Sequence, residues 1–229
     1  KIEHEEQLNK IFNDKSYSVS ELDEYAACPY KYFAHRILKP VIEEEYSRDL
    51  SPLEYGSMLH IILQKFYNWV IEEEAASIKE FQTNSGIILK GAQLTPNKYD
   101  IYHKKLHELA ENEFELFNIN NPIFDIEKKK ISDPDTGWLN LWLNSEIKRN
   151  EYWRFFPSMF EMGFGMGKDQ TFNSIKAGKI PLKGKIDRIE LDESAEGDLM
   201  FVVADYKSTK GSIKSKSDIF PDAIVHKSC

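Results

Sequence analysis

Two aspartates and a lysine near the end of the sequence, Asp187, Asp205 and Lys207, have the types and spacing that could do chemistry. The two carboxylates are expected to face each other across a strand pair, where they would repel. A divalent cation such as Mg²⁺ turns that repulsion into coordination, because hard cations prefer carboxylate oxygens. A lysine on the same face then positions a water or stabilises negative charge on a phosphate. Spacing alone favours the plainer alternative of a solvated hairpin face, so the rest of the chain decides.

A hairpin is predicted to position these residues. One stretch alternates apolar and charged residues, as in a half-buried strand, and a second is a continuous apolar run, as in a strand covered on both faces. A polar connection containing glycine joins them. The register then brings Asp187 opposite Ala204 or Asp205. The strand, the connection and the second strand are residues 182–191, 192–198 and 199–206.

The preceding sequence is predicted to be mainly helical. Capping signals and apolar periodicity predict helices over 1–13, over 17–40 with a break at Pro29, from Ser51, over 95–117 and from Asp133. Residues 77–94 and 124–132 show no regular pattern, and 43–49 reads as a linker. Strands are predicted over 152–164 and 170–177. The chain is therefore predicted to be one mixed α/β domain, with a helical part over 1–150 and a sheet with the hairpin over 151–229.

Composition limits the class of protein. With 229 residues and 41% hydrophobic content, the chain is a globular protein and lacks an apolar run of membrane-spanning length. Two cysteines, Cys28 and Cys229, give no disulfide framework and predict a reducing, cytoplasmic setting. A start at Lys1 suggests a fragment of a longer protein.

Charge is unevenly distributed along the chain. The net charge of −8 argues against a general nucleic-acid coat. Positive charge nevertheless gathers near the hairpin, which suits a polyanionic substrate. The candidate DNA-binding residues are Lys183, Lys185, Arg188 and Lys210. A lysine-rich surface without a ligand explains the same charges.

Two further residues have a structural interpretation as well as a functional one. His60 lies near the apolar stripe of the helix that begins at Ser51, where a lone histidine is usually a core residue. Cys28, just before Pro29, is usually a small buried hydrophobe.

Four segments in order together resemble the PD-(D/E)xK nucleases of the RecB and AddB type. The hairpin GKIDRIEL…FVVADYKST matches the family's aspartate strand followed by D/E-x-K. Residues 56–60 look like its GxxxH helix, 18–33 like the AddB-type opening segment with a cysteine before proline, and 157–164 like the strand before the hairpin. Each segment is weak by itself, and their order makes the resemblance specific.

The resemblance implies a fold and a set of roles. The fold would be restriction-endonuclease-like, with a small mixed central sheet flanked by helices, a helical N-terminal part and a truncated C-terminal end. Asp187, Asp205 and His60 would bind Mg²⁺ or Mn²⁺, and Lys207 would orient or activate the attacking water. Cys28 would be the first of four cysteines that hold a 4Fe–4S cluster, in the full-length protein only. The other three cysteines and the family's Gln-x-x-x-Tyr segment are missing, as expected of a chain cut short, so full activity is not expected.

The implied function is metal-dependent hydrolysis of DNA phosphodiesters, by an exonuclease rather than an endonuclease. The domain would belong to a helicase–nuclease or to a DNA repair or recombination protein, with DNA and a helicase segment or subunit as partners. The alternative is a degenerate nuclease fold that acts as a non-catalytic DNA-binding or scaffold module. A soluble domain whose charged hairpin simply faces water is the third interpretation.

Overall fold

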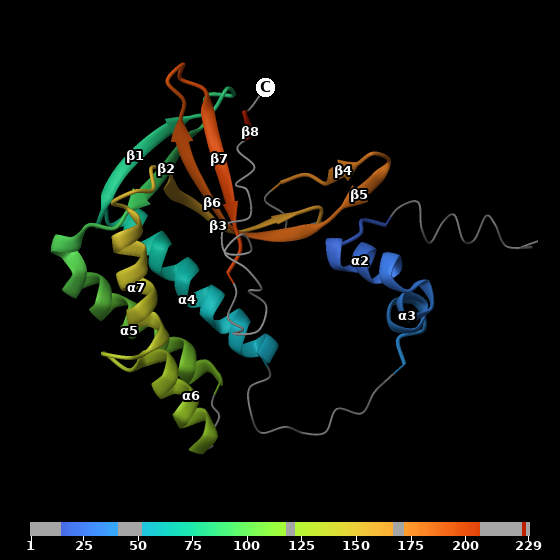
Figure 1. Cartoon of the computed structure of the whole chain (residues 1–229), viewed down its shortest axis with the longest axis horizontal. Helices are drawn as coiled ribbons and strands as arrows, with labels where there is room; N and C mark the ends of the chain where they lie inside the picture. Colours follow the sequence, from blue (N-terminus) through green and yellow to red (C-terminus); the bar gives the residue numbers. More distant parts are fainter. Residues whose placement is uncertain (1–14, 41–51, 118–121, 167–171, 207–225, 228–229) are drawn as a thin grey trace, which may run out of the picture. The chain divides into compact units, whose positions relative to one another are not determined.

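The computed structural model describes residues 15–40, 52–117, 122–166, 172–206 and 226–227, shown as ribbons in Figure 1. The predicted helix over 1–13, the linker over 43–49 and Ser51 lie outside these residues. The chain divides into two compact units, one formed by 1–45 and 162–186, the other by 46–161 and 187–229.

The first unit begins with the helix pair predicted around Pro29. Helix α2 (Val19–Ala27) ends before that proline, and α3 (Pro29–Tyr32) continues into a π-helix (Phe33–Leu38). The predicted capping box is confirmed, because Ser18 Oγ accepts from the Glu21 N–H at 3.2 Å and Glu21 Oε2 accepts from the Ser18 N–H at 2.9 Å. The short strands β4 (Ile175–Ala177) and β5 (Ile180–Leu182) pair antiparallel in the same unit.

Four helices dominate the second unit. They are α4 (Pro52–Glu72), α5 (Tyr99–Phe117), α6 (Pro122–Ser132) and α7 (Trp138–Arg149), with a 3₁₀ turn (Pro96–Lys98) before α5. The expectation of an irregular 124–132 segment was wrong: Phe124 and Ile131, two helical turns apart, are both buried on one face of α6. No helix in the described part of the chain is long and apolar enough to cross a membrane.

A four-stranded sheet carries the predicted hairpin. Its strands lie in the order β3 (Phe156–Phe164), β6 (Gly184–Glu193), β7 (Leu199–Ala204) and β8 (His226–Lys227). Strands β6 and β7 are antiparallel, with Arg188 paired to Ala204. Extended by one step beyond the end of β7, this register brings Asp187 opposite Asp205, which is one of the two positions that the sequence predicted.

A second hairpin, β1 (Ser77–Gln82) and β2 (Ile88–Gln93), occupies a region for which the sequence predicted no regular structure. Gly91 explains its close approach to β3. A Cβ atom at this glycine would lie 2.5 Å from Ser158 Oγ and 2.6 Å from Phe156 Cβ. The missing side chain therefore lets β2 pack directly on β3.

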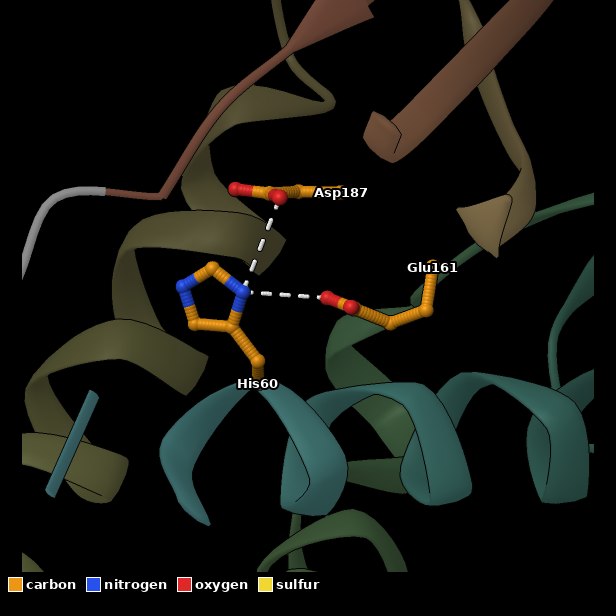
Figure 2. Close-up of side chains that lie close together, drawn as sticks. All are labelled: His60, Glu161 and Asp187. Carbon is orange, nitrogen blue, oxygen red and sulfur yellow. Dashed lines mark hydrogen bonds and ion pairs between the residues drawn. The ribbon is translucent and has the colours of Figure 1, made fainter. Parts of the chain in front are cut away.

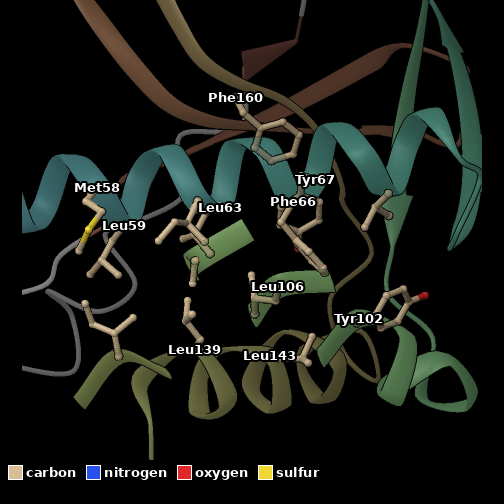
Figure 3. Close-up of a cluster of buried hydrophobic side chains, with 14 of the residues drawn as sticks. Met58, Leu59, Leu63, Phe66, Tyr67, Tyr102, Leu106, Leu139, Leu143 and Phe160 are labelled. Atoms are coloured by element: carbon tan, nitrogen blue, oxygen red, sulfur yellow. The ribbon is translucent and has the colours of Figure 1, made fainter. Parts of the chain in front are cut away.

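The hydrophobic core of the second unit is organised around α4. Figure 3 shows this helix between Phe160 of β3 on one side and Leu139 and Leu143 of α7 on the other. Tyr67 of α4 stacks on Phe160 with the ring centroids 4.7 Å apart. The buried α4 residues are Met58, Leu59, Ile62, Leu63, Phe66, Tyr67 and Val70. Such packing fixes α4 against β3, and with it the residues on the strand-facing side of the helix.

Candidate metal centre

Three side chains from three elements converge in the second unit (Figure 2). Nδ1 of His60, on α4, lies 3.0 Å from Glu161 Oε1 on β3 and 3.6 Å from Asp187 Oδ1 on β6. One donor atom from each residue falls within 4.8 Å of the others. The histidine is therefore not simply a core residue, and Asp187 does not belong to a hairpin face that points only into water.

Glu161 was not among the predicted site residues. Its backbone has φ 55°, which is uncommon for a non-glycine residue, and its side chain is 5% exposed. Such a conformation costs about 1–3 kcal/mol and tends to persist where function requires it. The available signal was a single acidic residue within the apolar run FFPSMFEMGFG. The strained backbone aims the carboxylate at His60.

Asp187 is held by a backbone hydrogen bond and sits near a second carboxylate. Its Oδ2 accepts from the Tyr206 backbone N–H at 2.8 Å. Burial is the main reason that the pKa of Asp187 is raised, and the charge and hydrogen bond of Asp205 add to it, while Tyr206 and His60 act in the opposite direction. The two aspartates thus interact across the hairpin, as their register requires.

The electrostatics of His60 reflect the same crowding of negative charge. Its hydrogen bond to Glu161 is the largest influence and raises the pKa, as do the charges of Asp187, Glu161 and Asp205, although burial opposes them. A proton on the imidazole therefore offsets part of the carboxylate charge. A divalent cation would satisfy the same electrostatic need.

The donor set fits a hard divalent cation. The two carboxylates are ligands that Mg²⁺ and Mn²⁺ prefer, and the imidazole nitrogen would add a ligand that is more typical of transition-metal ions. The group whose donor atoms lie within 4.8 Å of one another contains Glu161, whereas the sequence predicted His60, Asp187 and Asp205. Asp205 acts electrostatically on both His60 and Asp187 and so borders this group.

The structure places the other predicted residues differently. Lys207 and Lys210 lie outside the described residues, while Lys183 is half-buried and Lys185 is exposed. Arg188 corrects the prediction of a DNA-contacting side chain, since it is 1% exposed and forms ion pairs within the protein. A charged residue in a strand need not face water when acidic partners are buried with it.

Cys28 has a local role in the first unit. Its Sγ accepts from the Lys31 N–H at 3.4 Å and caps α3. An iron–sulfur cluster requires about four thiolate ligands. Cys28 is the single cysteine of the described ranges, and Cys229 lies outside them. These residues by themselves do not fit a cluster.

The fold and the site together define a mixed α/β protein with a candidate divalent-cation centre. Residues 16–223 match the model of the PD-(D/E)XK nuclease superfamily. Because the match covers most of the chain, the protein belongs to this superfamily, which confirms the resemblance carried by the sequence motifs.

Several curated relatives are named as a subunit of an ATP-dependent helicase/deoxyribonuclease. That of Natranaerobius thermophilus is 26% identical over 230 residues, covering 92% of this chain and 16% of the relative. The Clostridium kluyveri protein is 29% identical over 213 residues, which cover 89% of this chain and 16% of the relative. The Clostridioides difficile protein is 26% identical over 221 residues, which cover 93% of this chain and 17% of the relative. The chain thus spans about a sixth of these relatives' length and is related to the nuclease region of AddB-type proteins.

Proposed function

We propose that this chain is a Mg²⁺- or Mn²⁺-dependent nuclease domain that hydrolyses DNA phosphodiester bonds. The observation that carries the proposal is the meeting of His60, Glu161 and Asp187 within 4.8 Å in a chain of the PD-(D/E)XK nuclease superfamily. The restriction-endonuclease-like core of that superfamily is the expected fold around the site. Deoxyribonuclease activity is also what the names of the relatives describe.

Each residue has a proposed role. His60, Glu161 and Asp187 would hold the cation, with Asp205 as a further carboxylate at its border. A bound cation would generate hydroxide near neutral pH and neutralise the phosphate at the transition state. Lys207, two residues after Asp205, would orient the attacking water.

The proposal extends to the substrate and the partners. Lys183, Lys185 and Lys210 remain proposed DNA contacts, whereas Arg188 is excluded by its burial. By analogy with the relatives, the domain would work beside a helicase segment or subunit in DNA repair or recombination, and as an exonuclease rather than an endonuclease. A 4Fe–4S cluster would require cysteines in addition to Cys28.

Mutagenesis with two readouts tests the proposed function. Wild-type protein, Asp187→Asn and Asp205→Ala would be compared for Mn²⁺ binding by calorimetry and for Mg²⁺-dependent cleavage of end-labelled DNA. We expect both variants to lose cleavage and Asp187→Asn to lose the Mn²⁺ site. Glu115→Gln, an exposed change on α5, is the matched control and should behave as wild type.

Two outcomes would overturn the proposal. Cleavage that survives both substitutions would place the chemistry elsewhere. DNA binding by a wild-type protein without a Mn²⁺ site would instead support the scaffold interpretation. The length of the labelled products, mononucleotides or internal fragments, separates an exonuclease from an endonuclease.

A further inference from the structure

We infer that Tyr206 is a positioning residue of the metal centre, which couples the site to a buried charge network through its hydroxyl group. This inference rests on the proposed function, since it gives Tyr206 a part in shaping the same site. It adds a residue that would neither hold the cation nor touch the reacting phosphate.

Tyr206 contacts two members of the site at once. Its backbone N–H donates to Asp187 Oδ2 at 2.8 Å. Its ring meets the imidazole of His60 edge to face, with the ring centroids 5.5 Å apart and the planes at 78°. Edge-to-face contacts prefer a defined ring orientation. Displacement of Tyr206 would therefore disturb both side chains.

The other end of Tyr206 is anchored in the protein. Its hydroxyl oxygen accepts from Arg188 Nη1 at 3.2 Å. Arg188 in turn lies 2.7 Å from Glu146 Oε2 and 2.6 Å from Glu190 Oε1, and its guanidinium covers the ring of Tyr67 at 4.9 Å. Charges in such a low-dielectric setting are strongly attracted to their partners. Arg188 is consequently a fixed donor.

The network extends beyond Arg188 within the second unit. Arg149 Nη2 lies 2.8 Å from Glu190 Oε1, and Tyr67 donates to Glu146 Oε2. Two arginines thus balance two glutamates from α7 and β6, so the buried cluster has no net charge to draw it toward water. The ion pairs hold these four side chains together, while Nε of Arg149 and Nε and Nη2 of Arg188 have no hydrogen-bond partner among the described residues.

A plain packing role for Tyr206 would not require its hydroxyl group. Burial is the main reason that the pKa of Tyr206 is raised, to about 12, so the group stays neutral near neutral pH and acts as a hydrogen-bonding anchor rather than a base. Packing needs the ring alone, which phenylalanine also supplies. The two roles therefore differ in their sensitivity to loss of the hydroxyl group.

The test compares Tyr206→Phe, Tyr206→Leu and a matched control in the full chain. Tyr102→Phe is the control, because it removes another buried hydroxyl, which belongs to α5 and donates to the Ala75 carbonyl at 2.6 Å. The measurements are the Mn²⁺ dissociation constant by electron paramagnetic resonance, kcat and KM for DNA cleavage, and the NMR shifts of the His60 imidazole. Thermal unfolding of each variant reports on folding.

We expect Tyr206→Phe to weaken Mn²⁺ binding and to lower kcat, each by about 10-fold. Tyr206→Leu should change both quantities by up to about 100-fold, as found for residues that orient metal ligands. KM for DNA should change little. Tyr102→Phe should lose stability without a change in Mn²⁺ affinity or kcat. If Tyr206→Leu fails to fold, Tyr206→Phe alone decides.

The outcomes separate this inference from the proposed function. Wild-type Mn²⁺ affinity and kcat in folded Tyr206→Phe would overturn the positioning role and leave the nuclease proposal intact. A wild-type protein without a Mn²⁺ site would overturn the nuclease proposal. The NMR shifts still decide in that case: the His60 resonances should move in Tyr206→Phe and stay in Tyr102→Phe, and equal spectra would overturn the inference.

Discussion

The imidazole of His60 and the carboxylate of Glu161 form a hydrogen bond at 3.0 Å, although 101 residues separate them in the sequence. One residue comes from the central helix of the core, and the other from a strand position with an unusual backbone conformation. The pair links the stability of the unit to the chemistry proposed for it, and its consequences can be measured without a metal.

Glu161→Gln should lower the pKa of His60. The hydrogen bond to Glu161 is the largest influence that raises this pKa above 6.5, so its loss should bring the value closer to that of an ordinary histidine. An NMR titration of the imidazole measures the effect. Glu115→Gln should leave the titration unchanged, and an unchanged pKa in Glu161→Gln would show that the carboxylate does not act on His60.

The same pair predicts how stability depends on pH. Because the folded pKa of His60 is raised, the stabilisation is fully present below the unfolded pKa near 6.5 and is lost as pH rises through the higher folded value. Urea unfolding at several pH values should show this decline in metal-free wild-type protein. The decline should be smaller in Glu161→Gln.

Glu146 should make the second unit sensitive to acid. Burial raises its pKa, but Arg188 and Arg149 outweigh burial and leave the pKa below 4.5. The stabilisation is therefore present above the unfolded pKa and lost as pH falls through the lower folded value. In urea unfolding measured at several pH values, Glu146→Gln should make the free energy of unfolding fall less steeply at acid pH. The substitution should also lower that free energy by about 3–5 kcal/mol at pH 7, because it leaves Arg188 short of a partner. If the free energy of unfolding of Glu146→Gln fell as steeply at acid pH as that of Glu115→Gln, this explanation would be contradicted.

Gly91→Ala should destabilise the contact between β2 and β3. The added methyl group would meet Ser158 Oγ at 2.5 Å and Phe156 Cβ at 2.6 Å, so strands must shift at a cost of about 1–3 kcal/mol. Chemical denaturation measures the loss. Glu80→Ala, an exposed change on the neighbouring strand, should alter stability by no more than about 0.5 kcal/mol. Equal stability of the two variants would rule out tight packing at Gly91.

Ser18→Ala should loosen the first turn of α2. It removes the oxygen that accepts from the Glu21 N–H, and an N-cap of this type contributes about 1 kcal/mol. Hydrogen exchange of the Glu21 and Leu22 amides should accelerate about five-fold, while Ser16→Ala should leave these rates unchanged. Unaltered exchange in Ser18→Ala would mean that the cap contributes nothing to the helix.

Local patterns predicted the parts of the site that depend on local structure. The hairpin register that pairs Arg188 with Ala204 follows from alternation and loop length, and it places Asp187 opposite Asp205. His60 came from the family resemblance, because nothing in its own helix distinguishes it from a core histidine. These residues lie where short-range rules or a known motif apply.

The missed features depend on distant contacts. Arg188 looked like a surface cation because the sequence does not show that Glu146 of α7 lies beside it. Glu161 was missed because the sequence does not show that its backbone adopts a left-handed conformation inside a strand. The hairpin of β1 and β2 was missed because Gly91, a residue that usually weakens strands, is needed there for close packing.

The positive φ of Glu161 also restricts which residues can replace it. Glycine, asparagine and aspartate tolerate a positive φ most readily, yet the first two carry no charge and the third is one methylene shorter. Glutamate alone joins a negative charge to the length that spans the gap from β3 to α4. A saturation library at this codon should therefore contain variants that are more stable but cleave DNA less. The residues that tolerate a positive φ are not the ones whose carboxylate can reach the site.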